Sequence, residues 1–362
     1  MQVPIETVTV TACEVPTDQP ESDGTLEWDR TVVVLVEVQA QGATGFGYTY
    51  ADGATATLVR DTLGPLLLGQ DAFAIRALWE RQRAAVRNLG RSGVAAMAIS
   101  AVDVALWDLK ARALGLPLAD LLGRVRDSID IYGSGGFCSY RGERLERQLG
   151  DWAAAGLHAV KMKVGREPRA DPGRVRLARD AIGEAGLFVD ANGAYSRKQA
   201  LALAQTFAGC GVTWFEEPVS SDDLDGLRLL RDRAPPGMDI AAGEYGYDGD
   251  YFRRMLAAGA VDVLQIDATR CGGYTGALQA AALAEAHHLP LSCHCAPALH
   301  LPLACALPGM RHIEYFHDHV RIEHLLLSGV PRVELGCLVM DPSRPGLGLA
   351  PQPRALARHR IA

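Results

Sequence analysis

The chain has 362 residues, of which 48% are hydrophobic and 22% charged, and its formal net charge is −7. These proportions are typical of a folded protein, and an acidic chain with no lysine- or arginine-rich run is not one built to bind nucleic acid. It shows no 18-residue apolar span and no secretory leader, and its eight cysteines have no metal-finger spacing, so we expect a cytoplasmic protein with reduced thiols and no membrane partner.

The first third of the chain predicts strands followed by helices. Residues 3–14, 31–38 and 43–50 are rich in β-branched and alternating apolar residues, which predicts an antiparallel meander. Between the first two lies the polar, acidic stretch Pro16–Arg30, which we expect to be a loop, either a mobile lid or a solvated linker. From Thr55 to Gly123 the periodicity is helical, so this part is interpreted as an α+β unit.

After about residue 128, short apolar runs alternate with segments long enough to be helices. Eight runs are candidate strands: 129–133, 159–164, 187–190, 212–216, 240–244, 261–267, 289–294 and 313–316. Strands separated in this way by helices predict a parallel α/β barrel of the TIM type.

Two lysines lie on one face of the second candidate strand. Lys161 and Lys163 point the same way because side chains alternate along a strand. Only four of the 36 basic residues are lysine, so arginine is the usual cation of this chain. Lysine can lose its proton when desolvated and arginine cannot. We therefore interpret the pair as a proton-transfer site, the alternative being two solvated lysines on a strand edge.

Ionisable residues stand at seven consecutive strand ends, where a parallel barrel carries its active site. They are Lys163, Asp190, Glu216, Glu244, Asp267, His294 and Glu314. Three of the acids, Asp190, Glu216 and Glu244, would repel one another in one cavity unless they held a cation, and oxygen ligands suit Mg²⁺. Glu217 is not included, because it should face the other way or lie in the following loop.

His294 lies within Cys293-His294-Cys295, a pattern that raises the possibility of zinc. Alternation argues against zinc, because both cysteines should face the helices if His294 faces the barrel interior. Asp267, one strand earlier, is placed to hydrogen-bond the imidazole and raise its basicity, which favours an acid–base role. The other histidines of this region are expected to be structural or exposed: His300, His312, His317 and His319.

The arrangement resembles the enolase superfamily, and within it the mandelate racemase subgroup. Residues 98–123 are similar to that group's first signature segment, and residues 187–218 are similar to its second. The resemblance implies an N-terminal α+β capping domain over residues 1–125 and a modified (β/α)7β barrel over residues 126–345. It also implies that a tail of residues 346–362 returns to the capping domain.

The resemblance also assigns roles to residues. It implies one Mg²⁺ per active site, bound by Asp190, Glu216 and Glu244. Lys163 and the Asp267–His294 dyad match the family's proton-transfer groups, and Lys161 and Glu314 match groups that meet the substrate carboxylate. Asn192 and the residues of the covering loops, namely Trp28, Tyr48 and Tyr50, are further candidates for substrate contact.

Such a site abstracts the proton α to a carboxylate through a metal-stabilised enediolate. The resemblance favours dehydration of a sugar acid (an aldonate or aldarate) to a 2-keto-3-deoxy acid, with His294 assisting loss of the 3-hydroxyl. A racemase or epimerase of a 2-hydroxy acid or similar carboxylate is the alternative, and a non-catalytic carboxylate-binding relic is a third reading. The expected partners are a small carboxylate and further copies of the same chain in a homo-oligomer.

Overall fold

The alternating apolar segments near the N-terminus form an antiparallel sheet in the computed structural model, which describes residues 2–361. Its strands, in the order β1-β2-β3, are β1 (Thr7–Ser22), β2 (Glu27–Ala40) and β3 (Ala43–Tyr50). Gln41 and Gly42 join the last two with left-handed φ values of 49° and 78°, as a tight hairpin turn requires. The predicted meander is confirmed.

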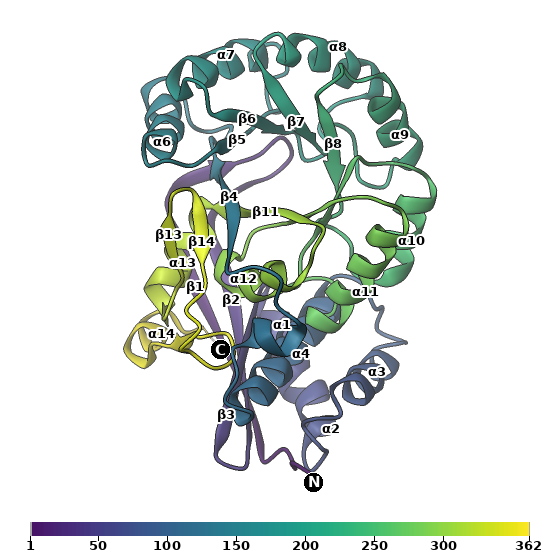
Figure 1. The fold of residues 1–362 in the computed structure, drawn as a ribbon, viewed down its shortest axis with the longest axis vertical. Coiled ribbons are helices and arrows are strands. Elements are labelled where there is room, and N and C mark those ends of the chain that lie inside the picture. Colours follow the sequence, from purple (N-terminus) through teal and green to yellow (C-terminus); the bar gives the residue numbers. More distant parts are fainter. Residues whose placement is uncertain (1, 362) are drawn as a thin grey trace.

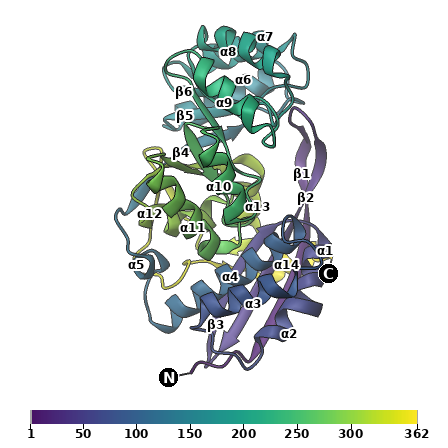
Figure 2. The same ribbon diagram turned by 90° about the vertical axis from the view of Figure 1, so that its right-hand side faces the viewer.

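The stretch Pro16–Arg30 belongs to a long β-hairpin. Strand β1 pairs with β2 as far as Ser22 opposite Glu27, with a register shift between Pro16 and Glu21. Because β1 is an edge strand of its sheet and is irregular here, it tolerates prolines that a central strand would not. The prediction of a loop over these residues was therefore wrong. The purple hairpin extends from the capping domain alongside the barrel (Figure 2).

The helices of this region are α1 (Gly53–Leu58), the π-helix η1 (Val59–Leu63), α2 (Gly64–Leu67), α3 (Ile75–Ala85), α4 (Val94–Ala113) and α5 (Leu118–Leu122). Helix α4 packs on β2 and β3, whereas α5 packs chiefly against α4 and the barrel. Helix α4 lies so close to β3 that a Cβ atom on Gly45 would stand 2.1 Å from the carbonyl oxygen of Ala105. Only glycine allows this approach.

Eight parallel strands close into a barrel, because β11 pairs with β4 as well as with β10. The strands are β4 (Ser128–Gly135), β5 (Ala159–Lys163), β6 (Gly186–Asp190), β7 (Val212–Glu216), β8 (Asp239–Ala242), β9 (Val263–Ile266), β10 (Leu291–Cys293) and β11 (Met310–Phe316). The helices between them are α6 (Glu143–Ala154), α7 (Asp171–Ile182), α8 (Arg197–Ala208), α9 (Leu224–Arg233), α10 (Gly249–Ala257), α11 (Gly273–Ala286) and α12 (Pro297–Ala306). Figure 1 shows this ring above the capping domain, and the predicted barrel is confirmed.

Aromatic side chains fill part of the barrel interior. Phe188 stacks on Trp214 with ring centroids 5.3 Å apart, and Tyr132 and His312 pack edge-on against them. Burial lowers the pKa of His312 to about 3, so its ring is neutral. The interior is thus a packed core beneath the strand ends, and the structural role expected for His312 is confirmed.

The chain after the barrel runs back toward the N-terminal sheet. It contains α13 (His317–Leu326), β12 (Leu327–Ser328), β13 (Arg332–Glu334), β14 (Cys337–Val339), β15 (Ala350–Pro351) and α14 (Pro353–His359). Near its end, the amide of Ile361 donates to the carbonyl oxygen of Ala12 on β1 (2.8 Å).

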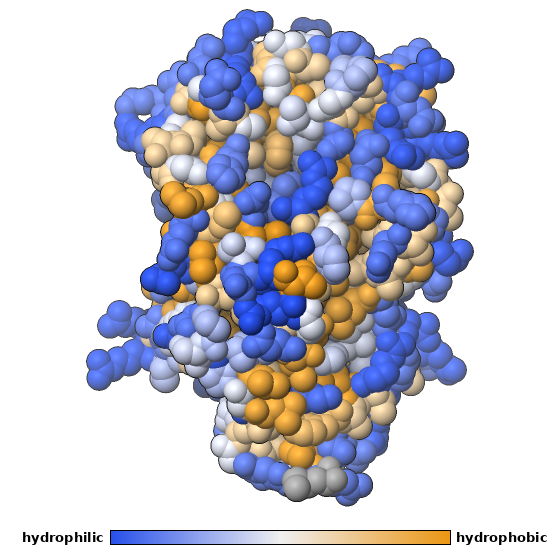
Figure 3. Space-filling model, viewed as in Figure 1, coloured by the Kyte–Doolittle hydropathy of each residue, from blue (hydrophilic) through white to orange (hydrophobic). Residues whose placement is uncertain are grey.

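The surface of the molecule is mixed in character. Hydrophilic and apolar residues are interspersed on the face drawn in Figure 3, and one apolar group lies over its lower part, where the capping domain lies. Within residues 2–361, no helix combines the length and the apolar character that crossing a membrane requires.

Candidate active site

Strand register places the central ionisable residues side by side. Lys163 on β5 is opposite Asp190 on β6, which is opposite Glu216 on β7. The ammonium nitrogen of Lys163 lies 2.5 Å from Asp190 Oδ2. Lys161 Nζ lies 2.6 Å from Glu216 Oε1 and 2.7 Å from Glu314 Oε1. All five side chains are buried, so the barrel encloses a network of charges rather than a solvated strand edge.

The three acids expected to bind a cation do converge. Asp190, Glu216 and Glu244 each offer an oxygen, and these atoms lie within 4.8 Å of one another. Glu244 Oε2 is buried and forms no hydrogen bond within the described residues. With Glu217 and Glu314, five carboxylates face three basic side chains, those of Lys161, Lys163 and Arg270, so acidic groups outnumber basic ones in the cluster. A buried all-oxygen ligand set with this charge fits Mg²⁺.

The excess of acidic groups raises the pKa of both lysines. Burial acts to lower the pKa of Lys163, but the neighbouring Asp190 outweighs it and holds the pKa well above its ordinary value. Lys161 is affected in the same way by Glu216 and Glu314. The low lysine pKa expected for a proton acceptor therefore requires a cation that neutralises these acids.

Asp267 and His294 form the expected dyad. His294 Nδ1 lies 2.8 Å from Asp267 Oδ2, and Asp267 Oδ1 accepts a hydrogen bond from the amide of Thr269 (2.7 Å). Burial acts to raise the pKa of Asp267, but the contact with His294 outweighs it and lowers the pKa. The ionised aspartate fixes the proton on Nδ1 and leaves Nε2 as the reactive atom. This atom lies 3.3 Å from Glu244 Oε2, whereas Lys163 meets the cluster at Asp190.

Glu217 also faces the acid cluster, which alternation did not predict. Strand β7 ends at Glu216, and Glu217 has a left-handed φ of 38° that turns its side chain back. Burial raises its pKa well above the ordinary value, and the charges of Glu244 and Asp190 add to the effect. Glu217 lies in the loop, as one of the two alternatives held, yet it remains part of the site.

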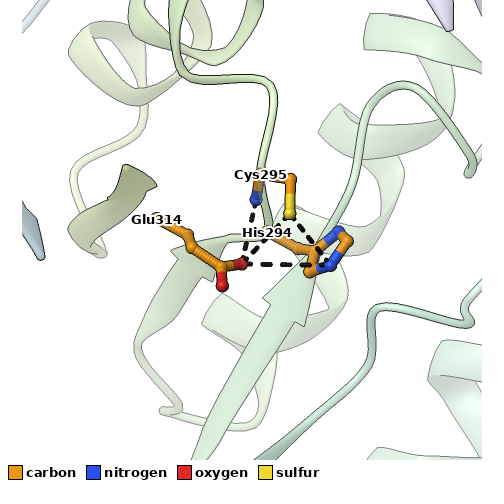
Figure 4. A group of neighbouring side chains, drawn as sticks. All are labelled: His294, Cys295 and Glu314. Atoms are coloured by element: carbon orange, nitrogen blue, oxygen red, sulfur yellow. Dashed lines mark hydrogen bonds and ion pairs between the residues drawn. The ribbon is translucent and has the colours of Figure 1, made fainter. Parts of the chain in front are cut away.

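Cys295 likewise contradicts the expectation that both cysteines face the helices. Strand β10 ends at Cys293, and Cys295 has a φ of 50°, so strand alternation no longer applies. Its sulfur lies 3.2 Å from His294 Nε2, and its amide donates to Glu314 Oε2 (3.1 Å), as Figure 4 shows. Cys293 does turn away from this group and packs against Met310.

Asn192 and Arg270 complete the immediate surroundings. Asn192 follows β6 with a φ of 44°, and its buried Oδ1 has no hydrogen-bond partner in the described residues. Arg270 was not predicted: its guanidinium lies 3.4 Å from Glu244 Oε1 and 3.5 Å from Asp267 Oδ2. The sequence feature that could have identified Arg270 is its position three residues after Asp267, where the loop turns back over the strand end.

The three aromatic residues expected to meet the substrate differ in position. Trp28 on the hairpin donates to Glu21 Oε2 (2.9 Å). The hydroxyl of the buried Tyr48 donates to Glu323 (2.6 Å), which gives Tyr48 a packing role and leaves its substrate contact without support. Tyr50 stacks on His319 with ring centroids 3.4 Å apart, and His319 in turn accepts a hydrogen bond from the amide of Ala296. Tyr50 thus braces the turn that carries Cys295.

The hairpin tip presses directly on the loops of the site. A Cβ atom on Gly24 would lie 2.4 Å from the carbonyl oxygen of Ala191 and 2.8 Å from that of Val164. These two residues directly follow Asp190 and Lys163. The hairpin therefore covers the ends of β5 and β6.

Two family descriptions match almost the whole chain. Residues 6–123 match the mandelate racemase / muconate lactonizing enzyme N-terminal domain, and residues 144–355 match the enolase C-terminal domain-like family.

Individual relatives match over similar lengths. The chain is 34% identical over 342 residues to the 3,6-anhydro-alpha-L-galactonate cycloisomerase of Streptomyces coelicolor, covering 92% of this chain and 93% of the relative. A mandelate racemase/muconate lactonizing enzyme-like protein from Rubrobacter xylanophilus has a crystal structure with a TM-score of 0.97 and 53% identity, covering 99% of this chain and 100% of that one. The L-talarate/galactarate dehydratase of Salmonella typhimurium, liganded with Mg and L-lyxarohydroxamate, gives a TM-score of 0.92 at 29% identity, covering 100% of this chain and 94% of that one.

Proposed function

Because the chain belongs to the mandelate racemase subgroup of the enolase superfamily, we propose that it is a Mg²⁺-dependent dehydratase of a sugar acid. The observation that carries the proposal is the placement of Lys163 and the Asp267–His294 dyad at different sides of one acid cluster. Proton abstraction and leaving-group protonation can then act on one bound carboxylate from two directions.

The cofactor fits the buried acids. Asp190, Glu216 and Glu244 would hold Mg²⁺, which supplies Lewis-acid polarisation of a substrate carboxylate when bound. Lys161 stays protonated beside Glu216 and Glu314, so its ammonium group can pair with the substrate carboxylate. That charge stabilises the second negative charge that develops when the α-proton leaves.

Two proton transfers complete the reaction. Lys163 takes the proton from C2 of the sugar acid, and the C3–O bond breaks. His294 Nε2 gives its proton to the departing oxygen, which leaves as water, and the resulting enol becomes a 2-keto-3-deoxy acid. Asp267 holds Nδ1 and stabilises the charged imidazole before this transfer.

A second candidate follows from the cycloisomerase relative. If the oxygen on C3 belongs to a ring ether, the same two transfers open the ring and no water is lost. Racemisation or epimerisation uses the same groups, with His294 returning a proton to C2. A non-catalytic relic is the least favoured reading, because every acid–base and candidate metal group is in place.

The test is to incubate the protein with Mg²⁺ and a library of aldonic, aldaric and anhydro-aldonic acids. Keto-acid formation with loss of water from an open-chain acid would support the dehydratase. A keto acid of unchanged mass from an anhydro acid would indicate cycloisomerisation instead. In D2O, deuterium at C2 without keto acid would indicate racemisation. No change in any acid would contradict the proposal and leave the relic.

The family premise also predicts a homo-oligomer. Light scattering on the purified chain should give a mass above the 38.8 kDa of one copy. A mass equal to one copy would contradict that part of the proposal.

A further inference from the structure

Three side chains beside the acid cluster bring nitrogen, sulfur and oxygen ligands together. Cys295 Sγ lies 3.2 Å from His294 Nε2 and 3.5 Å from Glu314 Oε2. His294 Nε2 lies 3.9 Å from Glu314 Oε2, so the three atoms form a small triangle (Figure 4). All three residues are buried. Neither the acid–base roles nor the candidate Mg²⁺ ligands require this thiol.

The triangle has the dimensions of three of the four ligand positions of a tetrahedral zinc site. Zinc lies about 2.3 Å from a thiolate and about 2.0–2.2 Å from an imidazole nitrogen or carboxylate oxygen, so its tetrahedral ligands stand roughly 3.3–3.7 Å apart. The three measured separations, 3.2, 3.5 and 3.9 Å, bracket this range. Shifts of a few tenths of an ångström would complete the coordination.

The outer contacts of these ligands also match those of a zinc site. Asp267 binds His294 Nδ1 at 2.8 Å, the carboxylate–histidine arrangement that orients an imidazole ligand and leaves its Nε2 lone pair toward the metal. Glu314 is held through its other oxygen, Oε1, by Ser134 Oγ (2.6 Å) and Lys161 (2.7 Å). Its Oε2 is therefore directed at Cys295, where, among residues 2–361, the Cys295 amide and thiol and the His294 ring approach it.

We propose that His294, Cys295 and Glu314 form a second metal site that binds Zn²⁺ or a similar thiophilic divalent cation and blocks proton transfer by His294. One thiolate and one carboxylate balance the charge of the ion. The site differs in chemistry from the oxygen-only set of Asp190, Glu216 and Glu244, because thiolate and imidazole select Zn²⁺ over Mg²⁺. A cation on Nε2 takes the place of the proton that His294 must donate from that atom, so the metal acts as an inhibitor.

The direct test is spectroscopic and needs no substrate. Co²⁺ is added to Mg²⁺-saturated protein and the near-ultraviolet thiolate-to-cobalt band is recorded. The band should appear in the wild type and in the control Cys293→Ala, and it should be absent from Cys295→Ser. Co²⁺ at the carboxylate cluster gives no such band, since that cluster contains no sulfur. Absence of the band in the wild type, or its persistence in Cys295→Ser, would overturn the proposal.

Calorimetry with Zn²⁺ on the Mg²⁺-saturated protein gives a second readout. Affinity should fall at least tenfold in Cys295→Ser and in Cys295→Ala, with folding checked by circular dichroism, and should stay within about threefold in Cys293→Ala. Equal affinity in all four proteins would mean that Zn²⁺ binds elsewhere and would refute the site.

Inhibition links the site to the reaction. With an accepted acid, Zn²⁺ should inhibit the wild type and Cys293→Ala, while Cys295→Ser requires at least tenfold more Zn²⁺. Inhibition of equal potency in Cys295→Ser would contradict the proposal. If no acid is turned over, the proposed dehydratase function fails, but the cobalt band and the Zn²⁺ affinities still decide whether this site exists.

Discussion

Two kinds of backbone supply the polar groups of this site. Regular strand positions carry Lys161, Lys163, Asp190, Glu216 and Glu314, whose direction follows from strand alternation and register. Residues just beyond strand ends carry the others, with left-handed φ values at Asn192, Glu217 and Cys295. Glu244, Asp267 and His294 also stand one or two residues beyond their strands, so the reacting centre draws on both kinds of position. The left-handed residues differ from the rest because strand alternation does not predict the direction of their side chains.

The largest effect should come from a strand position. Lys163→Ala should reduce turnover about 10²–10⁴-fold, the usual contribution of one acid–base group. Its Mg²⁺ affinity, measured by calorimetry, should be unchanged or higher, because Lys163 no longer competes for Asp190. The control is Met162→Leu on the opposite face of the same strand, which should keep most of its activity. Equal losses of turnover in both variants would mean that the loss does not depend on which face of β5 carries the substituted side chain.

Metal affinity next separates two acids that both lie beyond strand ends, of which Glu217 has a left-handed φ and Glu244 does not. Glu244→Gln should weaken Mg²⁺ binding at least about 100-fold if its carboxylate is a ligand, whereas Glu217→Gln, beside the ligands, should weaken it about tenfold or less. Calorimetric titration of both variants gives the ratio. If Glu217→Gln proved the more damaging change, the left-handed residue would be the true ligand.

Asn192 tests whether a turn residue serves through its side chain or its backbone. Asn192→Gly and Asn192→Ala both remove the free Oδ1, so both should raise KM several-fold if that atom contacts substrate. Only alanine adds the cost of a left-handed backbone, about 1 kcal/mol, which urea unfolding would detect. An unchanged KM in both variants would make Asn192 a purely conformational residue.

The smallest effect should occur on the hairpin, where Glu21 follows the register shift of β1. Burial, with the nearby charge of Asp318, raises the pKa of Glu21 from 4.5 to about 8. The stability contributed by this raised pKa is fully present below pH 4.5 and is lost as the pH rises through about 8. The fluorescence of Trp28, which donates to Glu21, should titrate near that pH.

Glu21→Gln should abolish this transition. Trp28→Phe should remove the pH-dependent part of the protein's tryptophan fluorescence. A transition near pH 8 that survives in Glu21→Gln would contradict the assignment.

The sequence predicted the barrel because its eight strands are short apolar runs separated by helix-length segments, and seven of these runs end in an ionisable residue. It failed where the backbone is irregular. Asn and Gly are the residues that usually signal a left-handed turn, whereas Glu217, Cys295 and Ala296 carry no such signal. Alternation was therefore applied one or two residues beyond the point where pairing stops. The hairpin was missed for a different reason, because the polar, acidic character of Pro16–Arg30 indicates a loop although these residues pair as an edge hairpin.

Pairing between β1 and β2 continues to Ser22 and Glu27, so the segment that covers the reacting groups is a ribbon with its own hydrogen bonds. Its pairing is interrupted at one place, between Pro16 and Glu21, and its tip lies at Gly24 against the carbonyl oxygens of Ala191 and Val164. The enzyme should therefore select ligands by length, because the hairpin is stiff and does not fold around the ligand.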